Sequence, residues 1–216
     1  MADRERLFSK QPLVVGAIAE EEAFGISMEG CDVIELRLDS LGWSEKVVNF
    51  SQKCPLPLLI TARGPDEGGA NHLSVEDRRM AYAALLPYAD AIDIELRSFE
   101  DLADLVEAAK RAGVFVVGSF HDFKKTPPLE ELQAKMGGVA DIHKFATMVL
   151  SEEDLETHRA LLAGEGKLSV MGMGPLGAAA RPEMMSLGSI LNYGFLGETP
   201  TAPDQWPAAE LKRVAF

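Results

Sequence analysis

Residues Val33–Asp39 have the sequence VIELRLD, in which apolar and charged side chains alternate. Alternation with a period of two is typical of a β-strand, and it puts Glu35 and Arg37 on the face opposite to Leu36. A strand of an ordinary parallel sheet is apolar on both faces. A charged face therefore predicts a polar interior, such as the inside of a barrel, with the apolar face packed against helices. An antiparallel sheet with its charged face in water is the alternative.

Short runs rich in Val, Ile and Leu predict strands along the chain, and the longer stretches between them predict helices. The strands are expected at Leu13–Ala19, Val33–Asp39, Leu58–Arg63, Ala91–Leu96, Val114–Asp122, Asp141–Thr147, Leu168–Met173 and Ile190–Leu196. The helices are expected at Glu45–Gln52, Ser74–Tyr88, Phe99–Ala112, Leu129–Met136, Ser151–Ala163 and Arg181–Leu187. The first connection, Glu20–Gly30, has room for only a turn or two.

This alternating order of strands and helices is typical of a parallel sheet with helices outside, which disfavours the antiparallel alternative. Eight such units favour closure into a barrel, although the usual length of about 250 residues exceeds the 216 residues of this chain. The sequence therefore predicts an α/β protein with one domain over residues 1–216, a (β/α)₈ TIM barrel with a shortened first helix.

The formal net charge of −13 arises from 34 acidic and 21 basic residues. An acidic surface repels phosphate backbones and anionic lipid, so we expect neither nucleic acid nor a membrane as a partner. A local basic pocket can still bind an anionic small molecule. The chain has only two cysteines, no signal-peptide pattern and no apolar run near the roughly 20 residues of a membrane span, which favours a cytoplasmic location.

Ionisable side chains gather where the predicted strands end, which is where barrel enzymes place their active sites. These candidate site residues are Glu35, Arg37, Arg63, Glu67, His121, Lys144 and Arg181. Lys144 shares a strand face with Ile142 and Ala146, so burial would favour its neutral amine, a nucleophile toward a carbonyl group. An ion pair with a barrel carboxylate such as Glu95 is an equally open interpretation.

His121 closes a predicted strand and is a candidate general acid and base, with Glu67 as the carboxylate that orients it. A histidine that only forms a hydrogen bond at a strand end is the alternative. On strand alternation, His143 should point away from Lys144. The four histidines show no metal-ligand spacing, and the glycines after Met171 lack the acidic partner of a dinucleotide site, so we expect no metal ion and no bound dinucleotide.

Six motifs resemble those of the type I 3-dehydroquinate dehydratase family. They occur in the same order as in the family, and together they span most of the chain. They are Glu35-Leu36-Arg37-Leu38-Asp39; Thr61-Ala62-Arg63 with Glu67-Gly68-Gly69; His121-Asp122-Phe123 with Thr126-Pro127; Asp141-Ile142-His143-Lys144-Phe145-Ala146; Met171-Gly172-Met173 through Gly177 to Arg181; and Ala202-Pro203-Asp204-Gln205. Four positions depart from the family pattern, because serines there are replaced by Gly16, Gly172, Ala180 and Thr201.

The resemblance implies a (β/α)₈ barrel that removes water from 3-dehydroquinate to give 3-dehydroshikimate in the shikimate pathway, which leads to the aromatic amino acids. It assigns Lys144 as the Schiff-base lysine, His121 as the general acid and base, and Glu67 as the group that orients His121. It implies that the substrate is bound by Glu35, Arg37, Arg63, Arg181, Thr201 and Gln205, the last two on a lid after the eighth strand. It also implies a homodimer that needs no cofactor.

Two other functions remain open at this point. A different lysine-imine barrel, such as a class I aldolase, is one, although those enzymes bind phosphate after strands seven and eight, where this chain has Arg181 and the Thr201–Gln205 loop. A barrel that only binds a ligand is the other, and the presence of Lys144, His121 and Glu67 together counts against it.

Overall fold

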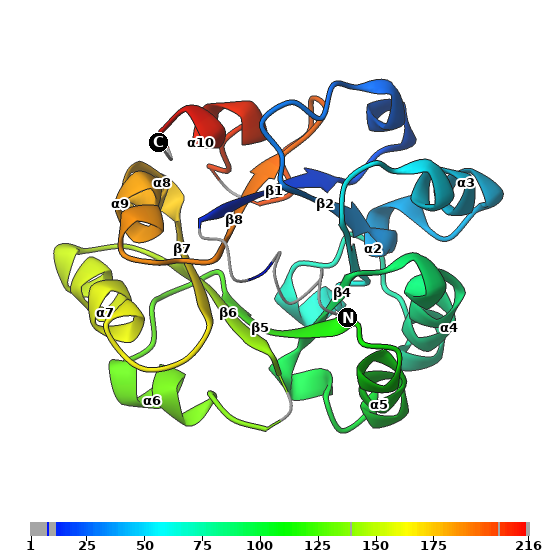
Figure 1. Ribbon diagram of the computed structural model, residues 1–216. Coiled ribbons are helices and arrows are strands. Elements are labelled where there is room, and N and C mark those ends of the chain that lie inside the picture. Colours follow the sequence, from blue (N-terminus) through cyan, green and yellow to red (C-terminus); the bar gives the residue numbers. More distant parts are fainter. Residues whose placement is uncertain (1–7, 9–11, 139, 203, 215–216) are drawn as a thin grey trace.

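The computed structural model of the protein describes residue 8 and residues 12–138, 140–202 and 204–214. Pro203 of the last motif and the N-terminal residues 1–7 lie outside these ranges. Eight parallel strands form one sheet in the order β7-β6-β5-β4-β3-β2-β1-β8, and Figure 1 views it with the helices around it. The strands are β1 (Leu13–Ile18), β2 (Val33–Arg37), β3 (Leu58–Thr61), β4 (Ala91–Glu95), β5 (Phe115–Asp122), β6 (Ile142–Met148), β7 (Leu168–Met173) and β8 (Leu191–Phe195).

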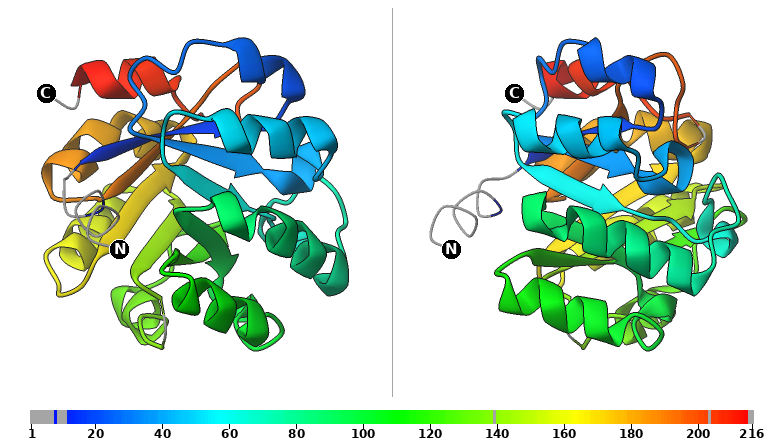
Figure 2. Two further views of the ribbon diagram at one scale, coloured as in Figure 1. Left: turned by 45° about the vertical axis from the view of Figure 1, so that its right-hand side comes forward. Right: turned by 90° about the vertical axis from the view of Figure 1, so that its right-hand side faces the viewer.

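The sheet closes where β7 meets β8 (Figure 1), and Figure 2 shows the barrel from two further directions. There the backbone N–H of Ile190 donates to the carbonyl oxygen of Leu168 at 2.9 Å. The structure thus confirms the predicted (β/α)₈ barrel. Among the described residues, no helix is long and apolar enough to cross a membrane.

The connections after the strands hold the helices and several 3₁₀ turns. The helices are α2 (Leu38–Leu41), α3 (Glu45–Lys53), α4 (Val75–Leu85), α5 (Ala103–Arg111), α6 (Leu129–Ala134), α7 (Glu152–Leu162), α8 (Gly174–Ala179), α9 (Arg181–Ser186) and α10 (Ala208–Val214). The 3₁₀ turns are η1 (Glu21–Gly25), η2 (Pro65–Glu67), η3 (Leu86–Tyr88) and η4 (Leu96–Ser98). The first connection holds only η1, as predicted, whereas α2, α8 and α10 were not predicted.

Several predicted boundaries are wrong by a few residues. The strand expected at Val33–Asp39 ends at Arg37, because Leu38 begins α2 and the chain turns there. The carboxylate of Asp39 accepts backbone N–H groups of Arg63 and Ala70 at 3.2 and 3.0 Å, which ties this turn to the next loop. The starts of α4 and α7 were predicted correctly, since the side chains of Ser74 and Ser151 cap these helices in capping boxes. In contrast, α5 begins at Ala103 and not at the predicted Phe99.

The two faces of the strands pack into different environments. Outward-facing side chains such as Ile34, Leu36 and Ile92 are fully buried against the helices. Inside the barrel, its amino-terminal end is apolar, and the ring of Phe8 lies 4.7 Å from that of Phe115 between centroids. Toward the carboxyl ends of the strands the interior of the barrel is polar. The buried polar side chains there include Glu35, Asp93, Ser119, Lys144 and Ser169. The polar interior predicted from Val33–Asp39 is therefore present, and it forms the floor of a pocket.

Candidate active site

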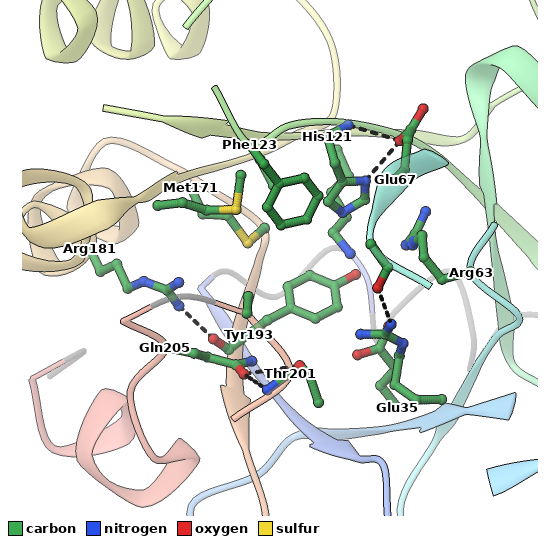
Figure 3. A pocket seen from close by; sticks show the side chains of 16 residues that line it. Glu35, Arg63, Glu67, His121, Phe123, Met171, Arg181, Tyr193, Thr201 and Gln205 are labelled. Atoms are coloured by element: carbon green, nitrogen blue, oxygen red, sulfur yellow. Dashed lines mark hydrogen bonds and ion pairs between the residues drawn. The ribbon is translucent and has the colours of Figure 1, made fainter. Parts of the chain in front are cut away.

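A pocket opens at the carboxyl ends of the strands, and Figure 3 shows the 16 side chains that line it. It brings together every site residue predicted from the sequence: Glu35, Arg37, Arg63, Glu67, His121, Lys144, Arg181, Thr201 and Gln205. The remaining lining residues are Gly68, Phe123, Ala146, Met171, Met173, Tyr193 and Ala202. Residues from six of the eight strands and their loops thus meet at one place, as the fold requires of such a site.

Lys144 reaches this pocket from the middle of β6, with only 6% of its side chain exposed. Its Nζ lies 3.0 Å from Oδ2 of Asp93 and 3.8 Å from the centre of the Tyr193 ring. Lys144 therefore forms an ion pair with a carboxylate inside the barrel, which was one interpretation of its burial. It also lines a pocket, as it must if its amine attacks a carbonyl group of a substrate. Burial lowers the pKa of Lys144 below its usual value, and the charge of Asp93 offsets this only in part. The lowered pKa increases the share of neutral amine.

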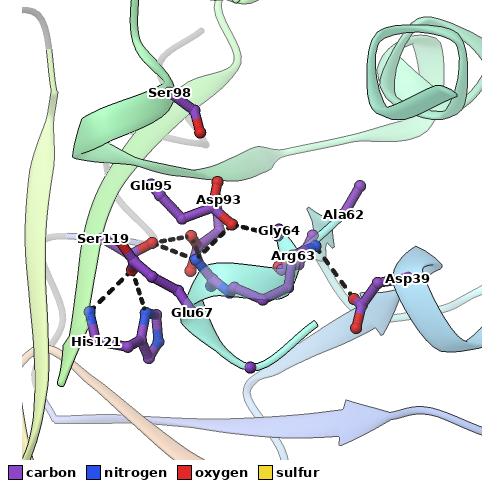
Figure 4. Close-up of polar contacts among 12 residues, drawn as sticks. Asp39, Ala62, Arg63, Gly64, Glu67, Asp93, Glu95, Ser98, Ser119 and His121 are labelled. Carbon is purple, nitrogen blue, oxygen red and sulfur yellow. Dashed lines mark hydrogen bonds and ion pairs between the residues drawn. The ribbon is translucent and has the colours of Figure 1, made fainter. Parts of the chain in front are cut away.

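The partner of Lys144 is Asp93 and not Glu95, because Glu95 is bound by two arginines. Arg78 pairs with one oxygen of Glu95, and Arg63 lies 3.4 Å from the other. Arg63 also pairs with Asp93 at 2.8 Å and donates to the hydroxyl oxygen of Ser119. We call this set, Arg63, Arg78, Asp93, Glu95 and Ser119, the paired cluster, and Figure 4 labels all of its members except Arg78. Every charge in it has a partner of opposite sign.

Glu35 and Arg37 extend the polar floor on β2. The hydroxyl group of Thr61 donates to Oε1 of Glu35 at 2.7 Å. The guanidinium of Arg37 donates twice to the Asp39 carboxylate, at 2.9 and 2.7 Å, and once to the carbonyl of Gly68 at 3.2 Å. Such bidentate pairing fixes the plane of the guanidinium and so the direction of its remaining donors.

His121 and Glu67 form a close pair beside Lys144. Oε2 of Glu67 lies 2.9 Å from Nδ1 of His121 and accepts its backbone N–H at the same distance. An ionised Glu67 therefore holds the hydrogen on Nδ1 and leaves Nε2 as the acceptor. Burial and the charges of Arg63, Lys144 and Arg37 lower the pKa of His121 well below its usual value. The imidazole is thus neutral at pH 7, the form that a general base needs.

The pKa of Glu67 itself is raised to about 7, mainly by burial, with Arg63 acting in the opposite direction. This carboxyl group therefore changes its charge close to neutral pH. In contrast, His143 points to the other side of the strand, as predicted. Its Nε2 lies 3.1 Å from the backbone nitrogen of Gly137, away from the pocket.

Arg181, the first residue of α9, lies on the opposite side of the pocket from the paired cluster (Figure 3). One nitrogen of its guanidinium donates to the carbonyl oxygen of Tyr193 at 2.6 Å. It forms no ion pair with any residue that the structure describes, and its buried Nε has no hydrogen-bond partner there. Burial lowers the pKa of Arg181 to about 10, although Asp204 acts in the opposite direction. A buried cation without a counter-ion is a binding site for an anion.

The loop after β8 covers the pocket beside Arg181. The backbone N–H and the hydroxyl group of Thr201 both donate to Oε1 of Gln205, at 2.7 and 2.9 Å. The amide oxygen of Gln205 is thus occupied, and its NH₂ group keeps its donors for a ligand. Glu20, two residues after β1, anchors this loop, since its carboxylate accepts from the backbone N–H of Glu198 and the hydroxyl group of Thr199.

Three of the four departures from the family pattern, Gly16, Gly172 and Ala180, lie outside the pocket lining, and only Thr201 belongs to it. A Cβ atom on Gly16 would lie 2.6 Å from the sulfur of Cys31, and one on Gly172 would lie 2.4 Å from the Cα of Gly177. Both glycines face tightly packed neighbours, and neither lines the pocket. Their lack of a serine hydroxyl therefore removes no contact from the pocket.

Sequence reasoning missed two residues of the site. Asp93 lies in the strand predicted at Ala91–Leu96, but its pairing with Lys144 depends on the register of β4, β5 and β6. Tyr193 was missed altogether, because a tyrosine inside a mostly apolar strand is no signal of a site. Its hydroxyl group is buried without a hydrogen-bond partner among the described residues.

Comparison with known proteins assigns the family. A family model described as Type I 3-dehydroquinase matches residues 17–216. A 3-dehydroquinate dehydratase of Thermodesulfovibrio yellowstonii is 32% identical over 213 residues, 92% of each chain. One of Methanococcus maripaludis is 35% identical over 193 residues, 85% of this chain and 86% of the relative. The crystal structure of 3-dehydroquinate dehydratase from Geobacillus kaustophilus, at 26% identity, matches with a TM-score of 0.81 over 95% of this chain and 90% of that one. The chain therefore belongs to the type I 3-dehydroquinase family.

Proposed function

We propose that the chain carries out the reaction of its family, the dehydration of 3-dehydroquinate to 3-dehydroshikimate, through an imine on Lys144. One observation carries this proposal: a buried amine with a lowered pKa and a buried arginine without a counter-ion line the same pocket. The substrate has a ketone for the amine and a carboxylate for the arginine. Together the two contacts would fix the ring in one orientation.

Lys144 acts first. Its neutral amine attacks the ketone carbon and a C–N bond forms. The ketone oxygen takes one proton from the amine and one from solvent and leaves as water, which gives an iminium ion. The positive nitrogen withdraws electrons from the neighbouring C2–H bond, which makes that proton far more acidic than in the ketone. Asp93 stabilises the cationic nitrogen, because its carboxylate lies 3.0 Å from Nζ in the free protein.

His121 moves the protons. Its neutral Nε2 removes a proton from C2, and the electron pair of that C–H bond moves toward the iminium to give an enamine. The enamine then expels the hydroxyl group at C1, which takes a proton from His121 and leaves as water. A C1=C2 double bond results, and hydrolysis of the iminium releases the product and restores Lys144. Glu67 holds His121 in the tautomer that these proton transfers require, with the hydrogen on Nδ1 and Nε2 free to accept a proton.

The other pocket residues hold the substrate. Arg181 pairs with the carboxylate, and Thr201 and Gln205 close the loop over that end of the ring. Glu35, Arg37 and Arg63 face the hydroxyl groups from the polar floor. A phosphorylated aldolase substrate suits this pocket less well, because the side of β7 and β8 presents one guanidinium and a Thr–Gln loop.

We further propose that the protein works in the cytoplasm as a homodimer with no metal or organic cofactor. The resemblance to the family supports the dimer, and the two free cysteines suit a reducing compartment.

The direct test of the function is turnover of 3-dehydroquinate, measured as the ultraviolet absorbance of the conjugated product. We expect wild-type turnover, none with Lys144→Ala, and unchanged turnover with Lys167→Ala, an exposed lysine at the other end of the barrel. A wild-type protein without activity, or an active Lys144→Ala variant, would refute the proposal.

A further inference from the structure

The side chain of Tyr193 presents an unused hydroxyl group to the pocket. Tyr193 lies on β8 and is 4% exposed, and its Oη has no hydrogen-bond partner in the part of the chain that the structure describes. In Figure 3 its ring lies between Arg181 and Arg63, and its hydroxyl group points away from Arg181. Buried hydroxyl groups are rarely left unpaired, because the loss of water is then not compensated.

The position of Tyr193 connects this hydroxyl group with the reacting centre. The face of its ring packs against Lys144, whose Nζ lies 3.8 Å from the ring centre. A substrate carbon bonded to Nζ is therefore held next to Tyr193. Arg181 holds the carboxylate at one end of the substrate ring, and the Tyr193 hydroxyl group is directed toward the other end.

The chemistry of the substrate limits what can lie there. 3-Dehydroquinate carries two hydroxyl groups at the end opposite its carboxylate, and one of them is on C4, directly beside the ketone carbon. The hydroxyl group of Thr61 already donates to Oε1 of Glu35. The donors that the polar floor still offers to a substrate are therefore charged groups, those of the arginines and of Lys144. A neutral phenol supplies a donor without adding charge. Burial, together with the nearby carboxylates of Asp93 and Glu35, raises the pKa of Tyr193 well above its usual value and keeps it in this form.

We propose that the Tyr193 hydroxyl group donates a hydrogen bond to the C4 hydroxyl oxygen of 3-dehydroquinate and so selects substrates that carry this group beside the ketone. This inference rests on the proposed function, which identifies the ketone at Lys144 and the carboxylate at Arg181. A site with an unpaired donor discriminates strongly against an analogue that leaves the donor unpaired.

The test compares two substrates in wild type and in Tyr193→Phe, which removes only the hydroxyl group. With 3-dehydroquinate we expect kcat/KM to fall about 10-fold to 100-fold, mainly through KM. With 4-deoxy-3-dehydroquinate, which lacks the hydroxyl group in question, the two proteins should have the same kcat/KM. The midpoint of urea unfolding should not fall, because the lost hydroxyl group has no partner in the free protein.

Tyr82→Phe is the matched control. Tyr82 is a fully buried tyrosine outside the pocket, and its hydroxyl group accepts from the backbone of Ala62 and donates to the carbonyl of Asp93. This variant should lose stability and keep the KM of the wild type. An unchanged kcat/KM for Tyr193→Phe with 3-dehydroquinate, or equal losses with both substrates, would overturn the proposal.

Failure of the proposed function would give a different result. If the wild type binds 3-dehydroquinate without dehydrating it, the function is wrong. The dissociation constants of the two proteins for the two compounds, measured by calorimetry, then make the same comparison. A difference confined to 3-dehydroquinate supports the role of Tyr193, and equal affinities contradict it.

Discussion

Arg63 and Arg181 line the same pocket and are almost equally buried, at 3% and 5% exposure, yet their surroundings are opposite. Arg63 belongs to the paired cluster, whose carboxylates hold its pKa above the usual value. Arg181 has one backbone carbonyl as its partner and a pKa lowered to about 10. A buried charge that is paired with an opposite charge in the free protein stabilises the fold. A buried charge without such a partner is available to bind a ligand of opposite charge.

The same comparison applies to the other unpartnered atoms. Besides Nε of Arg181, the buried side-chain atoms that lack a partner among the described residues are Oη of Tyr193 and Nδ1 of His158. Two of these three lie on the β7 and β8 side of one pocket, and His158 lies on α7 outside it. Only the two pocket atoms can gain a partner from a ligand. His158 should therefore affect stability alone.

After the loss of all turnover in Lys144→Ala, the next largest effect is expected at His121, a paired side chain whose second ring nitrogen is free to act in the pocket. His121→Ala should lower kcat about 10⁴-fold, because one imidazole serves several proton transfers. His143→Ala is the matched control and should keep near wild-type kcat, since His143 contacts Gly137 on the outer face of β6. Steady-state kinetics would reverse the assignment if His143→Ala were the inactive variant.

Asp93→Asn tests the paired cluster. The substitution leaves Arg63 and Lys144 without their shared carboxylate, so the free energy of unfolding should fall by about 3–5 kcal/mol. Urea denaturation measures this value. Asp104→Asn is the control, because Asp104 pairs with Arg79 at the surface and should contribute less than about 1 kcal/mol. Equal losses for the two variants would contradict a supporting role for the cluster.

Arg181→Met tests the other side of the pocket. We expect kcat/KM for 3-dehydroquinate to fall about 10²–10³-fold, because the substrate carboxylate loses a charge-assisted, two-pronged contact. Stability in urea should stay within about 1 kcal/mol of the wild type, since no ion pair within the described residues is lost. A stability loss as large as that of Asp93→Asn would break the contrast between the two sides.

His158 gives a smaller effect that depends on pH. Burial lowers its pKa to about 4 in the folded protein, from a usual value of 6.5. The unfolded chain takes up a proton below that usual value and the folded one does not, so stability present at neutral pH is lost as the pH falls toward 4. From about pH 7.5 to about pH 5, wild type should lose about 2 kcal/mol more than His158→Gln. Parallel losses in urea titrations would show that His158 does not titrate in this way.

The barrel could be predicted because Val33–Asp39 alternates between apolar and charged residues. Once helices lie between the strands and cover the apolar face, the charged face has to point into a polar interior. The strand end was predicted wrongly because Leu38 and Asp39 continue the alternation into a turn. The pocket residues could be listed from the motifs, since strand ends meet at one mouth of a barrel. The pairing of Lys144 with Asp93 and the unused hydroxyl group of Tyr193 depend on register and on what is absent nearby, which one sequence does not contain.

The most direct test of the central claim is trapping of the imine. Protein is mixed with 3-dehydroquinate, reduced with borohydride, and its intact mass is measured for wild type, His121→Ala and Lys144→Ala. We predict a covalent adduct with the wild type and with His121→Ala, whose lysine can still condense slowly, and none with Lys144→Ala. An adduct on Lys144→Ala, or no adduct on an active wild type, would contradict the assignment of Lys144 as the nucleophile in this pocket.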